Sequence, residues 1–358
     1  GPGVFINPRK LVEEISELKR QGIDVSPANY GIDARAHVTL DYHVRDDAFS
    51  FEVQKGKAGH ESTGNGVKQT ARDKVMRVGI RFGEWLQADC MFEIMHEKGL
   101  VSLLSGSTGT GESAEQTIRT LVHSYDSERE ILKPFVVQDH DIYAKHGKDG
   151  RLSEGAQGAL LDLDVGQYPG TTSSNPLLVP GYPDQRVGVI KLYTSSVGIA
   201  ERPFVARMHP SLESSLVEAW GERGVTTGRD RKLGWLDLVA LRYTIQAARV
   251  THLVGSCGDR LDTLFSKNEK IGVVVGYNVD DKLYDQWDVS FHNRFVLRKA
   301  KPVIEWFEPW QQFHKDGILT DESQRFVDFV QDRIGMEFHA IGVGPGDQDE
   351  LVLREFRD

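Results

Sequence analysis

Four short apolar runs alternate along this 358-residue chain with stretches of helical periodicity, and this alternation most constrains the fold. Short apolar runs predict buried strands, and apolar residues spaced three and four apart predict helices. Strands that alternate with helices are typical of α/β proteins, so we expect a mostly parallel central sheet flanked by helices. No repeat, low-complexity tract or clear linker divides the chain, so we expect one large domain over residues 1–358. The predicted strands are residues 186–193, 251–257, 271–279 and 337–343, and the helical stretches are residues 210–250 and 321–335.

Further elements are predicted near the N-terminus. Asn7 followed by a proline is typical of a helix start, and this helix is expected to end at Gly22. Residues 35–43 alternate between apolar and polar side chains, which predicts a strand. The glycine-rich stretches at 56–66 and 105–111 are predicted to be loops.

Composition excludes several classes of protein. The net charge of −10 argues against nonspecific nucleic-acid binding, which needs a basic face. Two cysteines, Cys90 and Cys257, are too few for a disulfide framework and fit a reducing compartment, so we expect a cytoplasmic protein. No apolar run reaches the length of a membrane-spanning helix, and no secretory signal opens the chain. We therefore expect neither a nucleic-acid nor a membrane partner.

Residues 224–232 place two glycines, two threonines and three cations in one short loop. Glycines allow the backbone to approach a ligand closely. Arginines such as Arg229 and Arg231 can hold carboxylates or phosphates through two parallel hydrogen bonds. The loop therefore predicts a site for small polyanions, with a solvated basic turn as the alternative.

Other polar segments suit nucleotide binding. The glycine-rich half of residues 62–81 is typical of a loop that holds a phosphate. Gln157 lies between two glycines, where its amide can bind a purine edge or a phosphate. Thr172 precedes a Ser-Ser-Asn run that is rich in hydrogen-bond donors. For Gln157 and Thr172, a hydrogen-bonded turn is the alternative.

Two segments look like sites only at first sight. Residues 105–113 nearly spell a phosphate loop, but Glu112 stands where the lysine belongs and would repel phosphates. Residues 139–141 read Asp-His-Asp, yet alternate side chains diverge in an extended segment, so a surface turn is expected instead of a metal site.

Four motifs in order, the first of them in two parts, resemble the adenylosuccinate synthetase family. Residues 3–8 and 35–43 are similar to GNGVVxxP and RAHxxxxYH, and residues 62–81 to TTGRGIGPAYxDKxxRxGIR. Residues 154–175 are similar to EGAQGxxLDxxxGxYPxVTSSN, and residues 224–237 to ATTGRxRRxGWLD. The resemblance implies a P-loop-NTPase-like α/β fold. It also implies a C–N ligase that joins L-aspartate to C6 of a 6-oxopurine nucleoside monophosphate, using Mg²⁺ and a nucleoside triphosphate.

The resemblance also assigns residues to ligands. It implies that Arg77 crosses a homodimer interface to the partner's nucleotide. The residues implied to bind the substrate nucleotide are Thr63, Arg77, Gln157, Thr172, Val197 and Arg229, and those for aspartate are Thr226, Thr227 and Arg231. The residues implied to bind the triphosphate are Arg231, Cys257, Gly258, Asp259, Gly342, Val343, Gly344 and Pro345.

The sequence departs from the family where the family binds the triphosphate. The guanine-reading segment TKxD is here Ser256–Asp259, which lacks the lysine, and the STGPDR segment has lost its serine at Gly342. A viral branch of the family uses ATP or dATP and acts on dGMP to make the precursor of 2-aminoadenine DNA. We therefore expect dGMP, aspartate and ATP or dATP to give 2-amino-2′-deoxyadenylosuccinate, in the host cytoplasm if the protein is viral.

Three alternatives remain open at this point. The chain could be an ordinary adenylosuccinate synthetase that uses IMP and GTP. It could be a noncatalytic nucleotide sensor that kept the binding pocket. It could also be an unrelated P-loop phosphotransferase that uses residues 106–113.

Two further family segments, GDEGKGK and GHNAGH, do not occur in this chain. The resemblance implies that the first carries the base and the magnesium-binding aspartate, and the second the acid. An α/β sheet without its first strands would expose a large apolar face, so we expect a preceding segment that this sequence omits, with a noncatalytic fragment as the alternative. We therefore name no catalytic residue and no metal ligand within residues 1–358.

Overall fold

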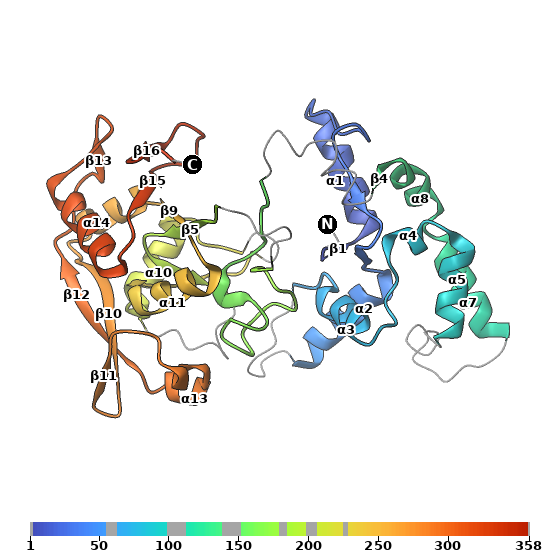
Figure 1. Cartoon of the computed structure of the whole chain (residues 1–358), viewed down its shortest axis with the longest axis horizontal. Helices are drawn as coiled ribbons and strands as arrows, with labels where there is room; N and C mark the ends of the chain where they lie inside the picture. The colour runs from blue at the N-terminus through green and yellow to red at the C-terminus, as the bar shows by residue number, and fades with distance from the viewer. Residues whose placement is uncertain are drawn as a thin grey trace. The chain divides into compact units, whose positions relative to one another are not determined.

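The computed structural model describes seven stretches of the chain (Figure 1). These are residues 3–54, 63–98, 112–137, 152–178, 185–197, 206–224 and 228–356. The chain divides into two compact units. Unit 1 is Gly1–Lys57 with Glu61–Ser153, and unit 2 is Ala58–His60 with Glu154–Asp358. The single domain expected over residues 1–358 stays a prediction, and each unit is described by itself.

Unit 1 is mainly helical. Its helices are α1 (Pro8–Arg20), α2 (Asp41–Gln54), α3 (Val67–Val75), α4 (Phe82–Trp85), α5 (Ala88–Glu97), α7 (Glu112–His123), α8 (Asp126–Leu132) and the 3-10 turn η1 (Lys133–Phe135). Two short parallel pairs join β1 (Phe5–Ile6) to β3 (His37–Val38) and β2 (Ile32–Asp33) to β4 (Val136–Val137). The core centres on fully buried Phe82, Trp85 and Tyr125.

The predicted first helix is confirmed as α1. The Asn7 side chain accepts hydrogen bonds from the backbone N–H groups of Arg9 at 3.1 Å and Lys10 at 3.2 Å, which satisfies two donors that a helix start leaves open. The helix ends at Arg20, and Gly22 follows with φ of 83°. Glycine adopts this left-handed conformation without steric cost.

The predicted strand over residues 35–43 is mostly wrong. Only His37–Val38 form a strand, because the partner strand β1 is itself two residues long. The Leu40 N–H donates to His43 Nδ1 at 2.9 Å, and α2 begins at Asp41. A local side-chain hydrogen bond thus turns the chain into a helix where the apolar alternation alone indicated extended backbone.

Unit 2 contains a four-stranded sheet in the order β16-β15-β9-β5 (Figure 1). The strands β5 (Val187–Lys191), β9 (His252–Ser256) and β15 (Phe338–Gly342) are parallel, and β16 (Glu350–Val352) is antiparallel to β15. A second sheet pairs β10 (Ile271–Val279) with β11 (Lys282–Tyr284) and β12 (Lys301–Phe307) antiparallel, and with β8 (Leu236–Asp237) parallel. The four predicted strands are therefore confirmed as β5, β9, β10 and β15.

Helices and short elements complete unit 2. The longer helices are α10 (Pro210–Ala219), α11 (Leu238–Ala248) and α14 (Asp321–Ile334). The helix predicted over residues 321–335 is confirmed as α14. The helical stretch predicted over residues 210–250 is confirmed only at its two ends, because two short strands lie between α10 and α11. The short elements are η2 (Ala159–Leu161), β6 (Thr194–Ser196), β7 (Lys232–Gly234), η3 (Asp259–Asp262), α12 (Thr263–Ser266), η4 (Val289–His292), α13 (Arg294–Leu297), β13 (His314–Lys315) and β14 (Ile318–Leu319). The core of the unit includes buried Trp310, Phe313, Phe326 and Phe338.

Parallel pairing brings three strand ends to one edge of the sheet. Lys191, the last residue of β5, pairs with Ser256, the last residue of β9, and β15 ends beside them at Gly342. Ligands of α/β proteins bind outside the carboxyl ends of parallel strands, so this edge is where a site is expected.

Among the described residues, none of the helices has the length and apolar character needed to cross a membrane.

Candidate substrate-binding site

Three cations surround one buried carboxylate at this edge. Glu222 Oε1 accepts from Lys191 Nζ at 2.5 Å and from Arg260 at 2.5 Å, and Oε2 accepts from Arg231 at 3.1 Å. The Tyr193 hydroxyl also donates to Oε1. We call Glu222, Lys191, Arg231 and Arg260 the Glu222 cluster.

The electrostatics of the Glu222 cluster favour an anionic ligand. Burial would raise the pKa of Glu222, but hydrogen bonds from Lys191 and Tyr193 and the nearby positive charges outweigh it and lower that pKa to about 2. Burial lowers the pKa of Lys191, and Glu222 offsets part of this effect. Three cations against one carboxylate leave a surplus of two positive charges.

The Glu222 cluster includes one residue predicted for aspartate binding, Arg231. Its backbone N–H donates to the carbonyl of Glu222 at 2.8 Å, so both its main chain and its side chain are fixed by one residue. Arg229 closes the same loop, because its carbonyl accepts from the Gly224 N–H at 2.8 Å. The other two predicted aspartate-binding residues, Thr226 and Thr227, lie outside the described residues.

The two segments predicted for the triphosphate meet at the same sheet edge. The Gly258 N–H donates to the carbonyl of Gly342 at 3.0 Å, which joins the end of β9 to the end of β15. A Cβ on Gly258 would lie 2.7 Å from the Phe313 ring, so only glycine fits there without a shift. Cys257 has φ of 61°, an uncommon value for a residue with a side chain. The structure thus brings together residues Cys257–Asp259 and Gly342–Pro345 in a tightly fitted backbone.

The loop after Gly342 is also held by its own carboxylate. Asp349 accepts from the Gly346 N–H at 2.8 Å, and the Val343 N–H donates to the carbonyl of Asp349 at 2.7 Å. A Cβ on Gly344 would lie 2.5 Å from the Asp349 carboxylate. A larger residue at position 344 would therefore displace Asp349, the side chain that holds this loop.

Buried Asp162 organises the segment that carries Gln157 and Thr172. Its carboxylate accepts from three backbone N–H groups at 3.0–3.1 Å, those of Asp164, Val165 and Leu177. The Thr172 N–H donates to the carbonyl of Leu161 at 2.8 Å, and its side chain is half-buried. Gln157 is exposed with φ of 64°. Thr172 is therefore part of a turn network, while the Gln157 amide faces solvent.

In unit 1, the predicted residues Thr63 and Arg77 flank helix α3 and are both exposed. Arg77 has φ of 62° and its carbonyl accepts from Lys98 Nζ at 2.5 Å. Asn65, which replaces a family arginine, accepts a hydrogen bond from Lys10. A cation therefore still lies at this loop, although it comes from α1.

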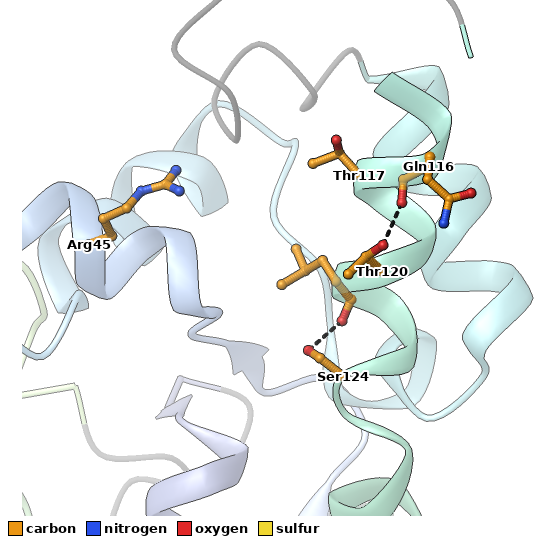
Figure 2. A pocket seen from close by; sticks show the side chains of 6 residues that line it. Arg45, Gln116, Thr117, Thr120 and Ser124 are labelled. Atoms are coloured by element: carbon orange, nitrogen blue, oxygen red, sulfur yellow. Dashed lines mark hydrogen bonds between the residues drawn. The ribbon is translucent and has the colours of Figure 1, made fainter. Parts of the chain in front are cut away.

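A cavity of about 390 Å³ in unit 1 is not the predicted site. Arg45 of α2 and residues of α7 line it, as Figure 2 shows. The hydroxyls of Thr120 and Ser124 donate to the carbonyls of Gln116 and Leu121 at 2.8 and 2.7 Å. None of the residues predicted for substrates lines this cavity.

The chain matches the family model described as adenylosuccinate synthetase over residues 1–351. The chain belongs to the adenylosuccinate synthetase family. An adenylosuccinate synthetase of Caldanaerobacter subterraneus is 32% identical over 376 residues, which cover 99% of this chain and 84% of the relative. One of Chlorobium limicola is 32% identical over 369 residues, covering 99% and 82%. The protein is therefore an adenylosuccinate synthetase-type C–N ligase, and the alternative of an unrelated P-loop phosphotransferase is wrong.

Solved structures confirm the predicted α/β fold. The fully ligated adenylosuccinate synthetase of Plasmodium falciparum superposes with a TM-score of 0.83 at 23% identity, covering 99% of this chain and 84% of that one. The cyanophage S-2L succinoaminodeoxyadenylate synthetase, bound to dGMP and dATP, gives a TM-score of 0.50 at 15% identity and covers 98% and 75%. These likenesses concern the fold of an adenylosuccinate synthetase.

The described residues of this ligase contain no metal site. Among the described residues, no three His, Cys, Asp or Glu side chains form a group that could hold a metal ion. The Asp-His-Asp pattern at 139–141 and residues 105–111 of the phosphate-like segment lie outside the described residues. The Mg²⁺ that the family resemblance implies stays a prediction, and no ligand for it is assigned in this chain.

Three members of the Glu222 cluster were missed by sequence reasoning. Glu222 precedes the predicted loop by two residues, and Arg260 follows the predicted Asp259 directly. Lys191 and Arg260 lie 31 and 38 residues from Glu222 along the chain, so no local spacing connects them. A charged residue near the end of a predicted parallel strand, such as Lys191, was the available signal.

Proposed function

We propose that this adenylosuccinate synthetase-type ligase joins L-aspartate to C6 of dGMP, with ATP or dATP as the triphosphate. The observation that carries the proposal is Cys257, which occupies the position of the lysine in the family's guanine-reading segment. The left-handed backbone at Cys257 and the packing of Gly258 against Phe313 support a base pocket of altered shape. Asp259 is retained, and Arg260 beside it is tied to Glu222.

The reaction has two steps. The γ-phosphate of the triphosphate is transferred to O6 of the purine, which becomes a good leaving group, and the aspartate amine then displaces that phosphate at C6. Arg231 is proposed to bind the aspartate carboxylate and the transferred phosphate, because a guanidinium binds either through two hydrogen bonds. Mg²⁺ would add charge stabilisation for the phosphoryl group when bound.

The residues predicted for the monophosphate complete the proposal. Four residues are proposed to bind the monophosphate substrate in their own subunit. These are Gln157, Thr172, Val197 and Arg229. Thr63 is proposed to bind its 5′-phosphate. Arg77 is proposed to act on the nucleotide of a partner subunit, which makes the active form a homodimer.

A product assay tests the proposal. Aspartate and Mg²⁺ are supplied, and dGMP, IMP and GMP are each combined with ATP, dATP and GTP. Turnover of dGMP with ATP or dATP is the expected result. The proposal fails if IMP with GTP is the productive pair, and nucleotide binding without turnover would instead support the noncatalytic sensor.

A substitution sharpens the assignment of Cys257. We expect Cys257→Lys to shift the preference from ATP toward GTP, because it restores the family's lysine. Asn268→Lys is the matched control, since Asn268 is exposed and also has a positive φ of 52°. An equal shift in both variants would contradict a role of position 257 in base selection.

IMP with GTP is the second candidate, and one observation favours it. The relatives from Caldanaerobacter and Chlorobium, each 32% identical to this chain, are described as adenylosuccinate synthetases. If this pair is productive, the altered base-reading residues do not change the choice of triphosphate.

A further inference from the structure

We infer that Lys191 and Arg260, together with Arg231, form one oxyanion-binding subsite for a co-substrate, and that Glu222 is the positioning residue that holds all three cations. The inference deepens the proposed function and rests on it. The oxyanion is a carboxylate of aspartate or the terminal phosphate of the triphosphate, which share the same recognition chemistry.

Burial and hydrogen bonding show that Glu222 is not itself available to a ligand. Its side chain is 1% exposed, and both of its oxygens accept hydrogen bonds from the cations. The three cations differ from it, because their side chains remain 27%, 28% and 30% exposed for Lys191, Arg231 and Arg260. The arrangement therefore presents cations toward solvent around a carboxylate that stays inside.

The hydrogen bonds of the two arginines leave donors for a ligand. Arg231 and Arg260 each donate to Glu222 through one terminal nitrogen, Nη1. The Nη1 atom of Arg260 also donates to the Tyr193 hydroxyl at 2.5 Å. A guanidinium carries five N–H groups in a planar fork. Binding of a carboxylate or phosphate through the other edge of the fork is compatible with these bonds.

The net positive charge of the Glu222 cluster explains why its ligand should be an anion. Placing three cations within reach of one carboxylate leaves two positive charges uncompensated by Glu222. Like charges at short range repel, and partial burial strengthens that repulsion by reducing solvent screening. A dianionic phosphate or a carboxylate pair would remove it, whereas an apolar ligand would not.

Position connects the subsite to the reaction. Lys191 ends β5, and Arg260 follows the Cys257–Asp259 segment proposed for the triphosphate. Arg231 directly precedes β7, at the point where the proposed aspartate loop enters this strand. One carboxylate thus couples the aspartate loop to the triphosphate segment, and this coupling fits a reaction that needs both co-substrates together.

The experiment measures binding and turnover of full-length chains carrying Lys191→Met or Arg260→Gln. The Kd values of ATP, dATP and L-aspartate come from calorimetry, and the KM values come from the product assay. We expect about a 10- to 100-fold increase in Kd and KM for at least one co-substrate, the loss associated with one charged hydrogen bond, and a nearly unchanged KM for the nucleoside monophosphate.

The two arms identify the oxyanion. An increase confined to aspartate assigns the subsite to its carboxylate, and an increase confined to ATP and dATP assigns it to the terminal phosphate. Lys191→Arg and Arg260→Lys keep the charge and are expected to recover most of the affinity. Lys270→Met and Arg325→Gln are the matched controls, because both residues form exposed ion pairs away from the Glu222 cluster.

Glu222→Gln tests the positioning role. We expect it to raise the same KM as the cation variants, because Arg231 and Arg260 lose the carboxylate that orients them. The inference is overturned if folded Lys191→Met and Arg260→Gln chains bind both co-substrates like the wild type. If those variants do not fold, the inference is overturned when salt has no effect on the affinity of the wild-type protein for either co-substrate.

Failure of the proposed function gives a different result. Wild-type turnover with IMP and GTP rejects dGMP and ATP as the substrates, and the variants are then compared on IMP, GTP and aspartate. Absence of wild-type turnover leaves the calorimetric Kd values as the deciding measurement.

Discussion

Two buried carboxylates, Asp73 in unit 1 and Glu222 in unit 2, are both kept ionised by hydrogen bonds from neighbouring side chains, but they differ in the groups around them. Each side chain is 1% exposed. For each, burial would raise the pKa, and hydrogen bonds from neighbouring side chains lower it instead. Asp73 accepts from the Tyr42 hydroxyl at 2.9 Å, His43 at 3.0 Å and Arg72 at 2.7 Å.

The difference lies in the partners. Asp73 is shared by a phenol, an imidazole and one guanidinium, and these groups tie α2 to α3. Glu222 is shared by three cations and a phenol at the carboxyl ends of parallel strands. A lowered pKa therefore marks both a structural carboxylate and a site, and the surplus of positive charge at a sheet edge distinguishes the second case.

Neutralising each carboxylate in turn should produce the largest difference between the two regions. Glu222→Gln is expected to lower the free energy of unfolding by about 3–5 kcal/mol, the typical cost of breaking a buried ion pair, and to raise a co-substrate KM. Asp73→Asn is expected to destabilise the protein without changing the KM of aspartate or triphosphate. Urea unfolding and steady-state kinetics measure the two effects. Equal KM changes in both variants would remove the distinction between the carboxylates.

Removing one arginine from each carboxylate should give a smaller contrast. Arg231→Leu is expected to raise the aspartate KM by about 10- to 100-fold, as expected for loss of one charged hydrogen bond. Arg72→Leu removes the corresponding guanidinium from Asp73 and should leave that KM within roughly twofold of wild type. An unchanged aspartate KM in Arg231→Leu would count against the role proposed for this residue.

Acid should reduce the stabilisation that both Asp73 and Glu222 contribute to the fold. The effect should be easier to measure for Glu222. Its pKa is lowered from 4.5 to about 2, which corresponds to about 3 kcal/mol of stabilisation at neutral pH. This stabilisation is complete above pH 4.5 and is lost as the pH falls toward 2. Thermal unfolding followed from pH 6 to about pH 2 should show a shallower decline for Glu222→Gln. For Asp73→Asn the decline should become shallower only below the ordinary carboxyl pKa of 3.8.

The smallest expected effect concerns glycines beside the two regions. Gly258→Ala should lower the free energy of unfolding by about 1–3 kcal/mol, because its Cβ would meet the Phe313 ring, which is a side chain and not backbone. Gly66→Ala should cost more, because its Cβ would lie 2.9 Å from the backbone of His43 and its φ is 73°. Urea unfolding of both variants checks the order. A larger loss in Gly258→Ala would show that Phe313 cannot move.

Local sequence patterns predicted much of the fold. Asn7 followed by proline predicted the start of α1, and the apolar runs predicted β5, β9, β10 and β15, because helix caps and strand periodicity depend on neighbouring residues. The prediction failed at residues 41–43, where the hydrogen bond from the Leu40 N–H to His43 begins a helix. Apolar alternation does not report such a side-chain contact.

The candidate site was predictable only in part. The loop at 224–232 indicated anion binding from its residue types, and the resemblance connected it with the segments at 257–259 and 342–345. The close approach of Gly258 to Gly342 needs parallel pairing of β9 with β15 across more than eighty residues, which no local pattern records.

The sequence by itself determined the family, the order of its elements and the residue types available for binding a nucleotide and aspartate. Only the tertiary structure decided that Lys191, Arg231 and Arg260 converge on Glu222. The physical reason is that charge acts through space, so a buried carboxylate collects partners that strand pairing brings to one sheet edge, whatever their separation along the chain.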